Sequence, residues 1–162
     1  MLNYDKTDDR IIGALDVIAK YDPALYRRMM RDDWTVTYRM SDMDAEIREM
    51  LASGDTYGAT IPKVCSEVDG SPNAGQTALA SSAIAARAQK VGVPISVFAA
   101  AVIVHEYEHI GQNCYQHPLD AEMPAFNAST EFARKLPEPY GARIEQFSEE
   151  SRRNNIIAAL FG

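Results

Sequence analysis

Two histidines and a glutamate stand at a spacing that suits metal chemistry. The stretch reads His105-Glu106-x-x-His109 and follows the most apolar run of the chain. On an α-helix the two histidines lie one turn apart, about 40° round the axis and about 6 Å along it, so both imidazoles can reach one ion. Glu106 sits at the edge of that face, where it can reach a water bound to the ion. The alternative is a pair of core or surface histidines that hydrogen-bond to their neighbours.

Zinc is the expected cofactor, because two imidazoles, one carboxylate and an open position form a catalytic zinc set. A third protein ligand is therefore required. The pattern that supplies a third histidine would place glycine at position 112 and histidine at position 115. Gln112 and Tyr115 stand there instead, which excludes that class of site. An acidic residue on another helix is the remaining common solution.

The region over residues 94–136 resembles the gluzincin branch of the zincins, the zinc metallopeptidases that carry HExxH. In that branch the motif is followed by a helix with glutamate, often in the pattern Glu-x-x-Ala with small and aromatic residues behind it. Glu122-Met123-Pro124-Ala125 fits this pattern. The resemblance implies that His105, His109 and Glu122 are the metal ligands. Pro124 departs from it: proline suits only a first helical turn, so we expect Glu122 near the start of its helix.

Three other residues are alternatives for the third ligand. Glu131 lies at a suitable distance in sequence but, nine residues on, faces the opposite side of the helix from Glu122. His117 is the second alternative, and it also suits an outer-shell or oxyanion-stabilising role. Asp120 is the third, although it is most simply an N-cap.

The resemblance implies a metallopeptidase reaction in which Glu106 is the general base. Glu106 takes a proton from the attacking water and passes it to the leaving amine. The candidates for a further oxyanion donor are Tyr115, His117 and Tyr140. For each tyrosine the alternative is an aromatic residue half-buried in the core.

Two rival functions are compatible with the same residues. One is a zinc amidase or endopeptidase that acts on cell-wall peptides, or a protease delivered as an effector or toxin. The other is a non-catalytic, zinc-stabilised binding module. Glu106 argues against the second, because a protein without turnover has no chemical need for the base.

Composition indicates an ordinary soluble globular protein, with 162 residues, 46% hydrophobic and 24% charged, enough for one domain spanning 1–162. The net charge of −7 argues against nucleic acid and anionic membranes, both of which select basic patches. We expect a monomer whose partner is a peptide or protein substrate. The polar, acidic N-terminus is unlike a Sec signal peptide, so a cytoplasmic location is expected, with non-Sec export open. Cys65 and Cys114 are free thiols or one disulfide, and the absence of C-x-x-C gives no indication of a thiolate zinc site.

Hydrophobic periodicity predicts a helix-rich α+β fold with a small sheet, and the resemblance implies that this fold is zincin-like. The run 97–104 is apolar on every face, which predicts a central buried helix that ends in the metal motif. The other expected helices lie at about 9–18, 23–30, 41–54, 76–91 and 120–136, with one or two more over 143–161. Strands are expected at 34–40 and 58–65, joined to the helix at 76 by a turn-rich loop. Pro62 places the second strand at a sheet edge, where it is either an ordinary edge strand or a site for pairing with an extended peptide.

Overall fold

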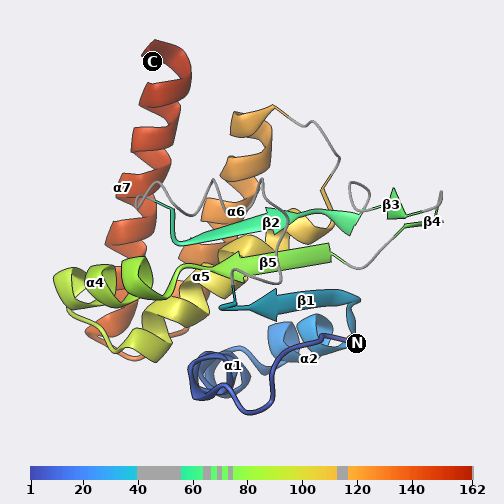
Figure 1. Ribbon diagram of the computed structural model, residues 1–162. Helices are drawn as coiled ribbons and strands as arrows, with labels where there is room; N and C mark the ends of the chain where they lie inside the picture. The colour runs from blue at the N-terminus through green and yellow to red at the C-terminus, as the bar shows by residue number, and fades with distance from the viewer. Residues whose placement is uncertain (40–55, 64–66, 69–70, 73–74, 113–116, 162) are drawn as a thin grey trace.

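The structure is a computed structural model that describes residues 1–39, 56–63, 67–68, 71–72, 75–112 and 117–161 (Figure 1). These residues form a helix-rich α+β fold with six helices and a small three-stranded mixed sheet, which confirms the predicted fold class. The helix expected over 41–54 lies outside the described residues, as do Cys65, Cys114 and Tyr115.

The central helix is α5 (Ile95–Ile110), and every residue from Val97 to Val104 is buried. This confirms the predicted buried helix, because a helix that is apolar all round needs protein on every side. The preceding helix, α4 (Ser81–Val91), ends at Gly92, whose φ of 81° is a left-handed conformation that glycine adopts without steric cost. Pro94 then directly precedes α5. Among the described residues no single helix is long and apolar enough to cross a membrane; α4 and α5 pass that test only together, with a bend of 115° between them.

The N-terminal helices α1 (Asp9–Tyr21) and α2 (Pro23–Arg31) match their predicted positions. The carboxylates of Asp8 and Asp22 cap them by accepting hydrogen bonds from backbone N–H groups of the first turn. The apolar stripe of α1 is buried and packs against α5. α1 covers the side of α5 away from α6 and α7, and α2 packs against α1 (Figure 1).

The sheet has the strand order β1-β5-β2. Strand β1 (Trp34–Thr37) runs parallel to β5 (Gly75–Leu79), and β2 (Gly58–Ile61) runs antiparallel to it. β2 is therefore an edge strand, as Pro62 predicted. The predicted loop between β2 and β5 contains a second, two-stranded sheet, β3 (Glu67–Val68) and β4 (Ser71–Pro72).

The prediction that a helix begins at residue 76 was wrong. Residues 76–79 belong to β5, and Thr77 pairs with Val36 on one side and with Thr60 on the other. Backbone hydrogen bonds to two neighbouring strands outweigh the weak helical preference of this short segment. The helical part of the predicted range begins only at Ser81.

The C-terminal part consists of α6 (Pro118–Ala133) and α7 (Tyr140–Phe161). The tail is thus one long helix, the first of the two predicted alternatives. α6 packs between α5 and α7, so one of its faces meets the metal motif and another meets the last helix (Figure 1).

Two details at the start of α6 differ from the prediction. The N-cap is His117 rather than Asp120: the His117 Nδ1 atom accepts a hydrogen bond from the N–H of Leu119 at 3.2 Å. The helix starts earlier than expected because Pro118 already has the φ that a first helical residue needs. Pro124 consequently stands inside the helix instead of in its first turn, and Asp120 lies in the first turn, where its charge suits the helix dipole.

Candidate metal centre

The last two turns of α5 carry the predicted motif out of the core. The side chains of His105 and His109 are 15% and 11% exposed, and Glu106 is buried. The ring of Phe126 packs edge-on against the His105 ring, with 4.6 Å between their centroids. Packing of this kind restricts the imidazole to one orientation, which a preorganised site requires.

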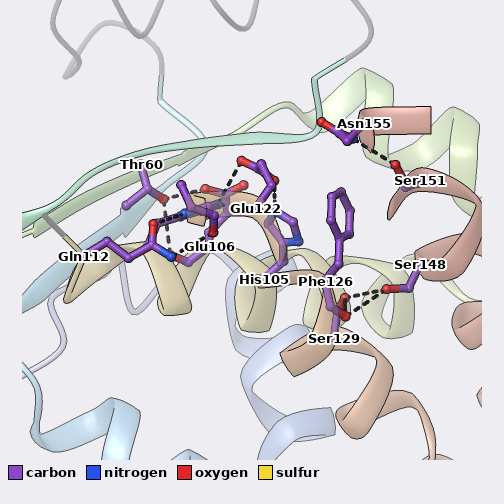
Figure 2. Close-up of polar contacts among 12 residues, drawn as sticks. Thr60, His105, Glu106, Gln112, Glu122, Phe126, Ser129, Ser148, Ser151 and Asn155 are labelled. Atoms are coloured by element: carbon purple, nitrogen blue, oxygen red, sulfur yellow. Dashed lines mark hydrogen bonds and ion pairs between the residues drawn. The ribbon is translucent and has the colours of Figure 1, made fainter. Parts of the chain in front are cut away.

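Glu122 of α6, the candidate ligand that the resemblance implied, lies beside both histidines. Its contact with His105 can be followed in Figure 2. Its Oε2 atom lies 3.0 Å from His105 Nε2, and its Oε1 atom lies 3.3 Å from His109 Nε2. The two Nε2 atoms are 3.4 Å apart. One ligand atom from each of these three residues lies within 4.8 Å of the others, and this is the group among the described residues that could hold a metal ion.

These separations fit the donor set of a tetrahedral metal. With metal–ligand bonds of about 2.0–2.1 Å, tetrahedral geometry puts neighbouring ligand atoms about 3.3 Å apart. Two imidazole nitrogens and a carboxylate, with one position left open, also match the chemical preference of zinc. The two nitrogens lie near this distance from each other, and each lies near it from a different oxygen of Glu122, so the residues fit a zinc ion in ligand type and in approximate spacing.

Charge in the group is arranged to favour a cation. Burial favours the neutral acid at Glu122, but hydrogen bonds to His105 and His109 outweigh it and hold the pKa of Glu122 at about 2. Burial likewise opposes an imidazolium at His109, but the hydrogen bond to Glu122 and the charge of Glu106 outweigh it and raise the pKa of His109 to about 9. A proton or a metal ion supplies the positive charge that the neighbouring carboxylates stabilise.

Gln112 determines which nitrogen of His109 is free to bind a metal. The Gln112 amide nitrogen donates to the carbonyl of Ala121 at 2.8 Å, which turns its Oε1 atom toward His109. That oxygen lies 2.7 Å from His109 Nδ1, and an amide oxygen only accepts, so Nδ1 carries the proton. In the neutral imidazole the lone pair is then on Nε2, the atom that faces Glu122.

Sequence reasoning considered Gln112 only as the residue that breaks the three-histidine pattern. Its position one turn after His109 was a signal that its side chain could reach that imidazole. The bond to Ala121 could not be foreseen, because it depends on how α6 docks against α5. Through this bond Gln112 joins the ligand helix α5 to the residue beside Glu122.

Glu106 is held from the opposite side, by the sheet. Its Oε2 atom accepts a hydrogen bond of 2.6 Å from the hydroxyl of Thr60 on β2. The Thr60 hydroxyl lies 2.8 Å from that of Thr77 on β5. β2 passes so close that a Cβ atom built on Gly58 would lie 3.0 Å from Glu106 Cγ. Sequence reasoning missed both threonines, and it had placed Thr77 in a helix.

The group opens onto a cleft of about 530 Å³. His105, Glu106 and Glu122 form one part of its wall, and aromatic and aliphatic side chains form another. The rest of the wall, apart from Gly58, is polar and consists of Thr56, Arg87, Ser129, Ser148, Glu150, Ser151, Asn154 and Asn155. The aromatic and aliphatic lining residues are Tyr57, Phe98, Ala101, Val102, Phe126, Ile144 and Phe147. A concave space of this size, with apolar and polar groups side by side in its wall, can take a small ligand or a peptide side chain.

The remaining candidates lie away from this group. Glu131 is exposed on α6, and Asp120 is exposed in its first turn, and neither belongs to the metal group found among the described residues. His117 is exposed at the N-cap of α6 and is not one of the residues that line the cleft. Tyr140 is half-buried at the start of α7 and packs against the core, as its alternative interpretation predicted. Tyr115 lies outside the described residues.

Comparison of the chain with protein-family models, with curated proteins and with solved structures found no match. The functional interpretation therefore depends on the geometry of the centre itself.

Proposed function

We propose that this protein is a zinc-dependent peptidase in which His105, His109 and Glu122 hold the ion and Glu106 is the general base. One observation carries the proposal: three ligand side chains from α5 and α6 converge, with one ligand atom of each within 4.8 Å of the others, beside a cleft that Glu106 also lines. A structural ion pair would need neither the carboxylate of Glu106 nor the adjoining space.

The residues of the chain divide the chemical work between them. When bound, zinc supplies Lewis-acid activation of a water and of the scissile carbonyl. Glu106 accepts a proton from the water as the oxygen of that water adds to the carbonyl carbon. Glu106 then delivers that proton to the amide nitrogen as the carbon–nitrogen bond breaks, so the products are a carboxylic acid and an amine. The packing of Phe126 and the hydrogen bond from Gln112 hold the histidines in place during these steps.

The surroundings of the centre suit an extended peptide. β2 pairs with β5 along one edge, and within the described part of the chain no strand pairs with its other edge. Thr56, Tyr57 and Gly58, at the start of β2, line the cleft. A peptide could therefore add to this edge through backbone hydrogen bonds while one of its side chains enters the cleft.

The test compares the wild type with Glu106→Gln, which retains the size of the side chain but removes its basicity. We expect equal zinc content by elemental analysis and hydrolysis of an unfolded protein by the wild type alone. A general base contributes about 10²–10⁴-fold, so the variant should lose at least that factor in kcat. The substrate panel should include cell-wall peptides, which separates a general peptidase from an amidase of narrow specificity.

Protein that binds no zinc when zinc is supplied would overturn the proposal. Equal turnover by the wild type and Glu106→Gln would remove Glu106 from the mechanism and contradict it as well.

A further inference from the structure

We infer that Thr60 and Thr77 form a positioning device for the general base, which holds one oxygen of Glu106 and leaves the other to carry the proton. The inference rests on the proposed function, because it gives these threonines a role in the same reaction. It is carried by the hydrogen bonds among three residues from β2, β5 and α5. Two of these residues, Thr60 and Glu106, are labelled in Figure 2.

The direction of each hydrogen bond follows from the number of protons available. A carboxylate is an acceptor only, so the single hydroxyl proton of Thr60 goes to Glu106 Oε2, at 2.6 Å. Thr60 then has no proton left for Thr77. Thr77 must therefore donate its own proton to the Thr60 oxygen, 2.8 Å away. The result is a one-way chain from Thr77 through Thr60 to Glu106.

The chain is rigid because each of its members is fixed by something else. Thr60 and Thr77 are direct partners in the β2–β5 register, so their hydroxyls face each other on the same side of the sheet. Thr77 is completely buried and Glu106 is 6% exposed. Gly58, two residues before Thr60, has no side chain and so allows the strand to lie directly against the Glu106 side chain.

This arrangement assigns different roles to the two carboxylate oxygens. Oε2 is occupied by Thr60, and among the described residues no group donates to Oε1. Every fully buried side-chain oxygen among the described residues has a hydrogen-bond partner. Because Oε1 has no partner among these residues, it is not fully buried, and it is open to the cleft that Glu106 lines. The geometry thus points to Oε1 as the atom that accepts and returns the proton.

The decisive variants are Thr60→Val, which removes the hydroxyl at nearly constant volume, and Thr60→Ser, which restores it. We expect kcat of Thr60→Val to fall about 10- to 100-fold, since small errors in the placement of a reacting group cost factors of this size. KM should change little, because Thr60 acts through Glu106 and not on the substrate. Thr60→Ser should recover most of the rate.

Two further measurements separate positioning from a general structural effect. Thr35→Val is the matched control, because Thr35 is a half-buried threonine of the same sheet, on the opposite edge strand, and we expect it to leave kcat unchanged. The carboxyl carbon of Glu106, assigned by its disappearance in Glu106→Gln, should shift in the NMR spectrum of zinc-free Thr60→Val and not in that of Thr35→Val. All the threonine variants should bind zinc as the wild type does.

The outcomes separate this inference from the function on which it rests. If the wild type hydrolyses no peptide, the proposed function fails and the role of the threonines fails with it. If the wild type is active and Thr60→Val has the same kcat, or if Thr60→Ser is no better than Thr60→Val, only the positioning role is overturned.

Discussion

Helix α6 carries two buried polar clusters, and they differ in the chemistry that they allow. On the side of α5, Glu122 meets His105 and His109. On the side of α7, the hydroxyls of Ser129 and Thr130 meet that of Ser148, at 2.8 and 3.1 Å. Both clusters consist of side chains close enough to hydrogen-bond, and both border the same cleft, which Glu122, Ser129 and Ser148 line.

The hydroxyl cluster is complete by itself. The Ser129 and Ser148 hydroxyl oxygens lie 2.8 Å apart, and each also lies within hydrogen-bond distance of the Phe126 carbonyl, at 3.0 and 3.2 Å. One of the two hydroxyls donates to the other, and that other hydroxyl donates to the carbonyl. The group is neutral, so burial creates no demand for a counter-ion. In the metal group, by contrast, a carboxylate and two imidazole nitrogens point at one place. Burial and hydrogen bonding alone are therefore not enough to indicate a metal site. Ionisable side chains whose ligand atoms converge on one point are also needed.

Removing a ligand should have the largest effect. Glu122→Gln retains the shape of the side chain but replaces the carboxylate with a poor zinc ligand. We expect zinc affinity, measured by competition with a chelator, to fall by more than the roughly 10- to 100-fold that loss of an outer-shell partner costs. Ser129→Ala, two turns further along α6, is the control and should bind zinc normally. Unchanged affinity in Glu122→Gln would exclude Glu122 as the third ligand.

Removing the residue that orients a ligand should have a smaller effect of the same kind. Gln112→Ala leaves all three ligands in place but frees the His109 ring. Zinc affinity should fall about 10- to 100-fold, whereas kcat at saturating zinc should stay close to that of the wild type. A loss of kcat without a loss of affinity would contradict the role assigned to Gln112.

Zinc should stabilise the wild-type fold by mass action. At a free zinc concentration 100 times Kd, the free energy of unfolding should rise by about 2.7 kcal/mol, and chelation should reverse the change. Thermal unfolding with and without zinc measures this difference. His109→Ala should show little or no shift, and a shift equal to that of the wild type would place the ion elsewhere.

The hydroxyl cluster should respond in stability alone. Ser148→Ala removes one buried neutral partner and should lower the free energy of unfolding by about 1–3 kcal/mol, with no change in zinc affinity. Chemical denaturation beside a zinc titration checks both. A marked loss of zinc binding in this variant would abolish the distinction between the two clusters.

The motif could be predicted from the sequence because its geometry is local. His105, Glu106 and His109 lie within two turns of one helix, and helical periodicity alone brings the two histidines to one face. The apolar run before them was enough to predict burial of α5. The capping aspartates Asp8 and Asp22 were equally local, since each caps the turn that directly follows it.

Predictions that depended on long-range pairing were less complete. Residues 76–79 were predicted to be helical because helical preference depends on the local sequence alone. It does not include the pairing of β5 with the strands on either side of it, β1 and β2. Pro124 was expected in the first turn because the helix was predicted to start at residue 120. The helix starts at Pro118, so Pro124 lies in its interior. Glu122 was ranked first by resemblance, and its contact with His105, 17 positions away, needed the packing of α6 on α5.

The sequence by itself determined two histidines, the glutamate between them and the helix that presents them, because those relations span a few residues. Only the tertiary structure decided what surrounds them. It brought Glu122 to the histidines, turned Gln112 toward Ala121, and placed Thr60 against Glu106 across 46 positions of the chain. Such contacts depend on strand register and helix docking, which the core as a whole establishes and no local pattern encodes.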